Sequence, residues 1–208
     1  MDPGLFYSPG IWLGAILIGY CFGCLDMAWL LAFYKGLDIK ALGNGNAGAS
    51  NALMTLGIKS GMLTAIWDIG KAIMACALTY HVLGGIWYVG VLSAGMAIIG
   101  HCFPFWLDFN GGKGFAPFIG FMLCLDWKLA AAVLAVGFLL CILADRIVVM
   151  TFFCALLWPI AIYIRFDWRW SLVCMAVSVL IFWRHTDNIR NLIDGSEPGI
   201  RAVLQKKR

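Results

Sequence analysis

Seven apolar segments recur along this chain, and they constrain its fold more than any other feature of the sequence. Crossing ~30 Å of hydrocarbon takes roughly 20 helical residues, and only helices satisfy their own backbone in lipid at such lengths. Of the 208 residues, 62% are hydrophobic and 12% are charged, which excludes a water-soluble globule. The sequence therefore predicts an all-α, polytopic membrane protein with seven transmembrane helices, folded as a single domain over residues 1–208. The expected segments are about 11–33, 61–82, 86–107, 114–125, 128–144, 147–164 and 170–184.

The distribution of lysine and arginine predicts the orientation in the membrane. With seven spans the two termini face opposite sides, so that 11 of the 15 basic residues fall on one side, 3 on the other, and Lys71 inside a span. The positive-inside rule places the more basic side in the cytosol. We therefore expect the N-terminus outside, the C-terminus in the cytosol and the polar loops on the cytosolic face. The basic tail over residues 201–208 is either a topology signal or a segment attracted to anionic membrane lipid.

Neither the cysteines nor the charge indicates a cofactor or a nucleic acid. The eight cysteines lie mostly inside apolar segments, which is typical of small buried side chains. Cys21 and Cys24 form a CxxC pair, but the apolar helix around them does not favour a zinc or redox site. His81 and His101 have no further ligands at metal spacing. The net charge of +4 comes mostly from loops and the C-terminus, so we expect no nucleic-acid partner, no metal and no cofactor. The first ten residues lack the pattern of a cleaved signal peptide.

Three polar, glycine-bearing segments interrupt the apolar sequence, and the predicted orientation places all three on the cytosolic face. The first, residues 43–51, combines residues that tolerate positive φ with successive backbone N–H groups, as anion-binding nests do. The second, residues 110–114, precedes the fourth apolar segment, where free amides at a helix N-terminus and the Lys113 ammonium can hold a phosphate. It lacks the spacing of a Walker loop. Turn formation alone would also explain either loop.

The third polar segment, residues 184–190, follows the seventh apolar segment. His185 and Asn188 are three residues apart, which places them on one helical face where they can orient a substrate together. Polar residues that merely close a helix at the membrane interface are an equally open interpretation.

Three charges lie inside the predicted spans, where an unpaired charge is costly. Asp68 and Lys71 are three residues apart and can pair, either as a structural ion pair or as the wall of a site. Asp26 should face the bundle or a wet cavity, because a carboxylate facing lipid would be costly. These charges and the polar loops together indicate an enzyme that acts on a phosphorylated lipid precursor.

Four groups of motifs resemble the bacterial acyl-phosphate:glycerol-3-phosphate acyltransferases, the PlsY family, in order and spacing over nearly the whole chain. The motifs lie at residues 38–51, 68–71, 100–114 and 184–189. The resemblance implies seven transmembrane helices in the bacterial cytoplasmic membrane and an active site on the cytosolic side. It also implies transfer of an acyl group from an acyl phosphate to the 1-hydroxyl of glycerol 3-phosphate, which gives lysophosphatidic acid for phospholipid biosynthesis without coenzyme A or a metal.

The same resemblance assigns roles to residues. Lys113, His185 and Asn188 are the candidate catalytic residues. The glycine loop with Lys113 would hold glycerol 3-phosphate, and His185 is the candidate protein base unless a substrate phosphate takes the hydroxyl proton. Because phosphate is a good leaving group, the protein mainly has to position the substrates and stabilise charge. Further candidates for substrate binding are Cys24, Asp26, Asn46, Ser50, Asn51, Lys59, Asp68, Lys71, Gly111, Gly112 and Gly114.

Several positions depart from the family pattern. The family's Gly-Ser-Ile-Pro in the first helix aligns with residues 23–26, which replaces the serine by Cys24 and adds a carboxylate at Asp26. Met54 stands where the family has an arginine, and Asn110 where it has a lysine. Each lost charge-assisted hydrogen bond is worth about 1.5–3 kcal/mol. Further departures are Pro117 and residues 149–151.

These departures leave alternatives open. A diverged paralogue would acylate a less charged acceptor, such as a sugar or polyol carrier, or use another activated acyl donor, with Asp26 as specificity element or base. A non-catalytic membrane partner or lipid-binding subunit would keep the fold, but retention of Lys113, His185 and Asn188 argues against it. A transporter is less favoured, because the chain lacks repeats and a charged path across the membrane. The sequence predicts neither the oligomeric state nor the preferred acyl chain length.

Overall fold

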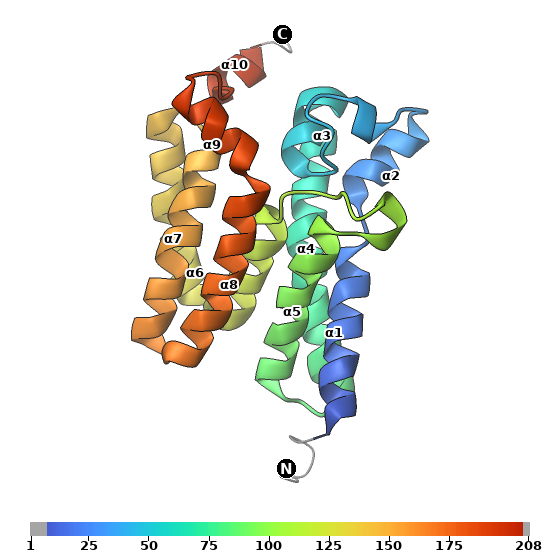
Figure 1. Cartoon of the computed structure of the whole chain (residues 1–208), viewed down its shortest axis with the longest axis vertical. Helices are drawn as coiled ribbons and strands as arrows, with labels where there is room; N and C mark the ends of the chain where they lie inside the picture. Colours follow the sequence, from blue (N-terminus) through green and yellow to red (C-terminus); the bar gives the residue numbers. More distant parts are fainter. Residues whose placement is uncertain (1–7, 206–208) are drawn as a thin grey trace. The chain divides into compact units, whose positions relative to one another are not determined.

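The computed structural model describes residues 8–205, apart from the side chains of residues 203–205, and every regular element in that range is a helix (Figure 1). Residues 1–7 and 206–208 lie outside the described part. The end of the predicted basic tail therefore lies outside it, and so does most of the N-terminal segment that was tested for a signal-peptide pattern. The chain divides into two compact units, one up to Leu125 and one from Asp126 onward. The all-helical class is confirmed.

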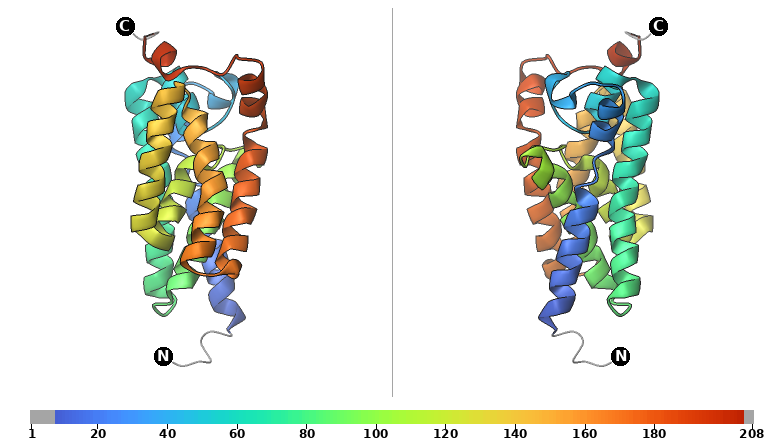
Figure 2. Two further views of the ribbon diagram at one scale, coloured as in Figure 1. Left: turned by 90° about the vertical axis from the view of Figure 1, so that its left-hand side faces the viewer. Right: turned by 90° about the vertical axis from the view of Figure 1, so that its right-hand side faces the viewer.

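The first unit is built around three long helices. Helices α1, α4 and α5 run alongside one another, and α2 and α3 contact α4 and each other (Figures 1 and 2). The bounds are α1 Pro9–Gly23, α2 Met27–Tyr34, η2 Ile39–Ala41, α3 Ala49–Leu56, α4 Ile58–Val82, α5 Trp87–Cys102 and η3 Phe105–Leu107. The unit ends with the first part of α6.

The helix predicted over residues 11–33 is interrupted, which corrects the expectation of one continuous helix, although Pro9–Tyr34 is still a single candidate membrane span. Helix α1 ends at Gly23 and α2 begins at Met27. Asp26 is the N-cap of α2, where its Oδ1 accepts the backbone N–H of Trp29 at 3.2 Å. Aspartate is favoured at this position because its side chain satisfies an amide that has no partner inside the helix. The carboxylate therefore starts a new helix within the apolar segment.

Glycines bring α1 and α5 into close contact. A Cβ at Gly19 would overlap the carbonyl oxygen of Ser93 and lie 2.7 Å from the Cβ of Met96. One turn later, a Cβ at Gly23 would lie 2.8 Å from the Cα of Gly100. The two backbones approach this closely because small residues at four-residue spacing leave no side chain between membrane helices. The crossing holds the interruption after α1 beside the end of α5.

Helix α6, Phe115–Ala144, consists of two helical parts that meet at Asp126, whose backbone angles are extended (φ −154°, ψ 100°). The Asp126 Oδ1 accepts the backbone N–H groups of Lys128 and Leu129, each at 3.1 Å, and so caps the second part. Its Oδ2 accepts a hydrogen bond from Arg165 Nε at 3.1 Å. The predicted segments 114–125 and 128–144 correspond to these two parts.

After the second part of α6, the second unit continues with helices α7, α8, α9 and α10. Helices α7 and α8 lie side by side (Figure 2), and Asp167 caps α8 by accepting the backbone N–H of Arg169 at 2.8 Å. The segment before α10 returns to the α6–α7 turn, where Asp145 accepts the backbone N–H groups of Ile200 and Arg201. The bounds are α7 Ile147–Arg165, α8 Trp168–Arg184, α9 Thr186–Ile193 and α10 Ile200–Gln205.

Five helical stretches in the described part of the chain are long and apolar enough to cross a membrane. They are Pro9–Tyr34, Ile58–Val82, Trp87–Leu107, Phe115–Ala144 and Ile147–Arg165. A multi-pass membrane protein is therefore confirmed, whereas seven crossings are not. The difference arises at α8, which has 17 residues, and at α6, whose 30 residues count as one stretch although Asp126 divides them.

The close crossing of α1 and α5 predicts a specific sensitivity. Gly19→Ala should lower the free energy of unfolding by about 1–3 kcal/mol, because the added methyl group meets backbone that cannot move aside. Gly10→Ala is the matched control, since its Cβ would lie 3.6 Å from Ser8 Oγ in ordinary contact. Denaturant unfolding in detergent measures both variants. Equal stability of the two would contradict a crossing at backbone distance.

Candidate functional site

The first polar loop is organised by a single buried amide. Asn51 is 1% exposed, and its Nδ2 donates to the carbonyl of Leu42 at 3.0 Å and of Ile39 at 3.4 Å. Its Oδ1 accepts the backbone N–H of Asn44 at 3.2 Å. Gly43, at φ +58°, passes so close that a Cβ would overlap this oxygen. Asn51 thus shapes the loop through contacts with its backbone.

The N-terminus of α3 follows directly from this loop. Gly48 is its N-cap and offers no side chain to the first amides of the helix. Ser50 is exposed in the first turn, and Asn46, half-buried, has its backbone N–H bound to Asn44 Oδ1 at 3.2 Å. Backbone amides at a helix N-terminus attract anions.

The second polar loop lies against the end of α5. The backbone N–H of Gly111 donates to the carbonyl of Cys102 at 3.1 Å, and that of Gly112 to the carbonyl of His101 at 3.0 Å. Both glycines are buried, and Lys113 follows as a half-buried side chain before Gly114 and the start of α6. The loop thus places a lysine at a helix N-terminus.

The two loops meet within the first unit. A Cβ built on Gly48 would lie 3.8 Å from the Cα of Gly112, which is ordinary contact distance. The N-terminus of α3 and the loop that precedes α6 are therefore neighbours, although these glycines are 64 positions apart in sequence. Of the three predicted polar segments, the structure brings these two together.

A buried polar cluster lies behind the second loop. Lys71 and Asp68 have fully buried side chains, with 2.8 Å between Lys71 Nζ and Asp68 Oδ1. The same Nζ lies 2.9 Å from His101 Nδ1 and 3.2 Å from the carbonyl oxygen of Leu25. Lys71 Nζ thus has two hydrogen-bond partners and one charge partner, while neither carboxylate oxygen of Asp68 has a hydrogen-bond partner among the described residues. The geometry fits a structural ion pair, and a role of these two residues in substrate binding stays a prediction.

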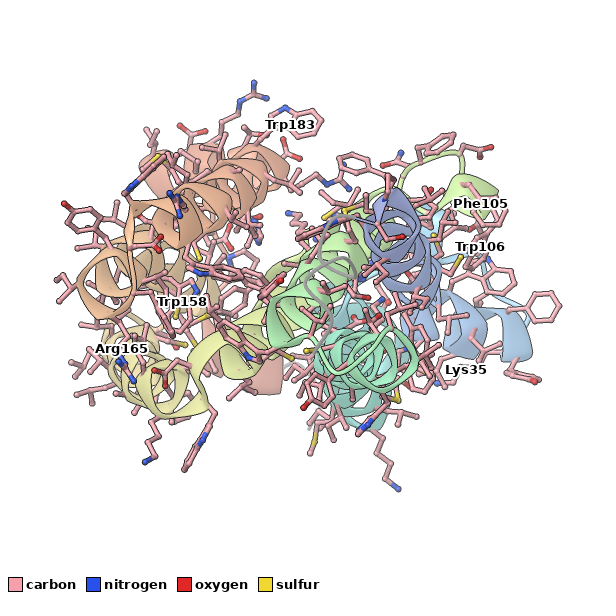
Figure 3. All side chains as sticks on the ribbon, turned by 90° about the horizontal axis from the view of Figure 1, so that it is seen from below. Lys35, Phe105, Trp106, Trp158, Arg165 and Trp183 are labelled. Atoms are coloured by element: carbon pink, nitrogen blue, oxygen red, sulfur yellow. The ribbon has the colours of Figure 1, made fainter. Side chains whose placement is uncertain are left out.

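Two backbone carbonyls in the interruption between α1 and α2 accept hydrogen bonds from tryptophan side chains. Trp106 Nε1 donates to the carbonyl of Cys24 at 2.9 Å, and Trp67 Nε1 donates to the carbonyl of Leu25 at 2.9 Å. Figure 3 shows Trp106 on the same side of the first unit as the blue ribbons of α1 and α2. Carbonyls that a broken helix would leave unpaired in an apolar environment are thereby satisfied.

Asp26 completes this interruption. It is 5% exposed, and beyond the cap its Oδ2 has no hydrogen-bond partner among the described residues. Asp26 interacts electrostatically with Asp68 and Lys71, so it belongs to the edge of the same buried cluster. Its position as the N-cap of α2 accounts for a carboxylate where the family pattern has a helix-breaking proline.

His185 and Asn188 belong to the second unit. His185 is 6% exposed at the junction of α8 and α9, with Nδ1 2.8 Å from the carbonyl oxygen of Ile181. A carbonyl only accepts, so Nδ1 carries the proton and Nε2 is the basic nitrogen of the neutral ring. Asn188 Nδ2 donates to Glu197 Oε1 at 2.8 Å. The sequence analysis did not single out Glu197.

The remaining predicted residues lie at the edges of the first unit. Lys59 is exposed in the first turn of α4, and Met54 is half-buried on α3. Another lysine, Lys35, donates to the carbonyl of Leu56 at 3.0 Å at the end of α3. The contacts of His101 were also missed from the sequence, because this residue was considered only as a metal ligand and its partner Lys71 is 30 positions away.

Comparisons with known proteins identify the family. A family model described as glycerol-3-phosphate acyltransferase matches residues 13–195. A glycerol-3-phosphate acyltransferase of Maricaulis maris (strain MCS10) is 38% identical, over 90% of this chain and 87% of that protein. One of Brucella canis is 32% identical, over 97% of this chain and 98% of that protein.

Two crystal structures share the fold. Both are of PlsY (YgiH), an integral membrane glycerol 3-phosphate acyltransferase. The glycerol 3-phosphate form gives a TM-score of 0.82 at 23% identity, over 90% of this chain and 94% of that one. The lysophosphatidic acid form gives 0.80 at 24% identity, over 93% of this chain and 98% of that one. Taken with the family model and the curated relatives, these matches confirm the resemblance: the chain belongs to the glycerol-3-phosphate acyltransferase family.

Proposed function

We propose that this protein transfers an acyl group from an acyl phosphate to the 1-hydroxyl of glycerol 3-phosphate, which yields lysophosphatidic acid. The observation that carries the proposal is the meeting of two glycine loops, at Gly48 and Gly112, beside Lys113. Backbone amides, a helix N-terminus and an ammonium together suit a phosphomonoester. Membership of the family and the names of the relatives support the same acceptor.

The reaction requires little covalent help from the protein. The acceptor oxygen attacks the acyl carbon, the bond from that carbon to the phosphate oxygen breaks, and inorganic phosphate leaves with its electron pair. The hydroxyl proton passes to a base. Lys113 and the N-termini of α3 and α6 contribute by holding the acceptor phosphate and by compensating its charge.

We keep for His185 and Asn188 the roles that the family resemblance implies. His185 can accept the hydroxyl proton at Nε2, because its Nδ1 proton is held by the carbonyl of Ile181. A phosphate oxygen of a substrate is the alternative acceptor of that proton. Asn188 is oriented by Glu197, whose carboxylate oxygen fixes which side of the amide carries the nitrogen.

Replacing Lys113 tests the proposed phosphate loop. Lys113→Ala should reduce formation of lysophosphatidic acid by about 100-fold, because a charge-assisted contact to the acceptor phosphate and its positioning are lost together. The measurement is transfer from palmitoyl phosphate to labelled glycerol 3-phosphate by the purified protein. Lys128→Ala is the control, since Lys128 is exposed and lies over the Trp127 ring. Unchanged turnover of Lys113→Ala would overturn the loop assignment.

The alternative of a less charged acceptor depends on Asp26 as a base or specificity residue. If Asp26 instead acts as the N-cap of α2, its substitutions should affect stability more than transfer. Asp26→Asn keeps a good N-cap, so transfer to glycerol 3-phosphate should stay within about twofold of wild type. Asp26→Ala loses the cap and should lower stability by about 1 kcal/mol. Transfer to glycerol 3-phosphate and to glycerol is measured for both variants. Loss of all transfer in Asp26→Asn would instead make this carboxylate a base.

We also propose seven crossings, with the N-terminus outside and the C-terminus in the cytosol of a bacterial cytoplasmic membrane. The proposal rests on the distribution of lysine and arginine and on the division of α6 at Asp126. This topology places residues 43–51, 110–114 and 184–190 on the cytosolic side.

Reporter fusions distinguish seven crossings from five. Alkaline phosphatase fused after Gly85 or after Asp167 should be active, because seven crossings place both turns outside. Green fluorescent protein fused after the last residue should fluoresce in the cytosol. With five crossings the Asp167 fusion would be inactive while the other two would behave as stated.

A further inference from the structure

His101 touches both the buried ion pair and the glycine loop. Its Nδ1 lies 2.9 Å from Lys71 Nζ and 3.6 Å from Asp68 Oδ1. Its backbone carbonyl accepts the N–H of Gly112 at 3.0 Å. The residue is 2% exposed, at the end of α5. His101 is thus bonded through its side chain on one side and through its main chain on the other.

The contact with Lys71 determines how the imidazole is held. An ammonium has no lone pair, so Nδ1 must accept, and in the neutral ring the proton is on Nε2. Lys71 is itself held by Asp68 and by the carbonyl of Leu25. The ring therefore cannot turn without breaking a bond to a buried charge, which is among the most costly bonds to lose.

The opposite edge of the same ring meets Gly112. A Cβ at Gly112 would overlap Nε2 and would lie 2.5 Å from Cε1 and 3.0 Å from Cδ2. Apart from the chain neighbours of Gly112, the three nearest atoms in the described part of the chain all belong to His101. The imidazole is therefore the surface against which this part of the glycine loop is folded.

We propose that His101, held by Lys71, is a positioning residue that sets the path of the loop at Gly111 and Gly112 and thereby places Lys113 for binding of a phosphomonoester. This rests on the proposed function, since it is the loop beside Lys113 that would bind the acceptor phosphate. The N–H groups of Gly111 and Gly112 already donate to the carbonyls of Cys102 and His101, so the loop acts by fixing where Lys113 and the start of α6 lie. A charged group binds an anion well only when its position is fixed in advance. The ion pair thus contributes to recognition without touching substrate, by fixing a ring that fixes the loop.

Two variants of His101 separate its contacts. His101→Asn places an amide oxygen near the position of Nδ1 and keeps an acceptor for Lys71, but removes the ring edge at Gly112. His101→Gln places an amide nearer the position of Nε2 and gives up the acceptor for Lys71. Each should raise KM for glycerol 3-phosphate by about tenfold while KM for palmitoyl phosphate and kcat change less.

The sharper test pairs His101 with Gly112. Gly112→Ala should raise KM for glycerol 3-phosphate by at least about tenfold, because its methyl group meets the ring. In the double variant with His101→Asn the obstructing atoms are gone, so its KM should be no higher than that of the worse single variant. If the fold-increases in KM of the two single variants multiply in the double variant, the inference is overturned. So would a His101 variant that melts near the wild-type temperature with unchanged KM.

The same proteins distinguish this inference from the proposed function. Wild-type formation of lysophosphatidic acid tests the function, and the KM pattern of the variants tests the positioning. If the wild type gives no transfer, the rise in melting temperature on adding glycerol 3-phosphate replaces KM. If that rise in melting temperature occurs in the wild type and is lost in both His101 variants, the positioning role is supported although the proposed function is not. No rise in the wild type would overturn it together with the function.

Discussion

The arrangement of the first unit depends on one buried ammonium. Lys71 forms an ion pair with Asp68 on α4, and its Nζ is within hydrogen-bond distance of His101 on α5 and of the carbonyl of Leu25 between α1 and α2. A charge in a low-dielectric interior is tolerated only when every proton has an acceptor and a counter-charge lies close by. Losing one acceptor would leave an incompletely bonded charge. The geometry of these three elements is therefore coupled, and the glycine loop that His101 supports is coupled with them.

The interruption of the first apolar segment is possible because the carbonyls of Cys24 and Leu25 and the first amides of α2 have hydrogen-bond partners. The indole N–H of Trp106 donates to the carbonyl of Cys24, and that of Trp67 donates to the carbonyl of Leu25. Asp26 caps the helix that follows. A proline breaks a helix by removing a donor, whereas an aspartate breaks it by offering an acceptor to the next helix. The two residues reach the same break by different means. The departure from the family pattern at Asp26 therefore needs no new substrate to explain it.

Hydropathy and glycine content predict much of this protein, because both can be read along the chain. The apolar segments match helices or parts of α6, and the predicted convergence of residues 43–51 with residues 110–114 is found within the first unit. The break after Gly23 was missed, because a single carboxylate in an apolar run does not reveal whether it caps a helix or faces a cavity. The roles of Asn51 and His101 were missed for a related reason. Each depends on tertiary hydrogen bonds, which periodicity does not encode.

An anion site made from the main chain responds to substitution differently from one made from side chains. Surrounding cations add attraction, each worth about 1.5–3 kcal/mol when directly bonded, but they do not determine the direction of the amides. Met54 and Asn110 stand where the family pattern has cations. Their loss weakens the positive field around the loops but leaves the path of the loop backbone unchanged. A residue that touches the loop backbone has no such freedom, because a shift of about 1 Å in the loop displaces Lys113 and the start of α6 together. We infer that this difference explains why Gly111, Gly112 and His101 keep the family pattern while nearby charges depart from it.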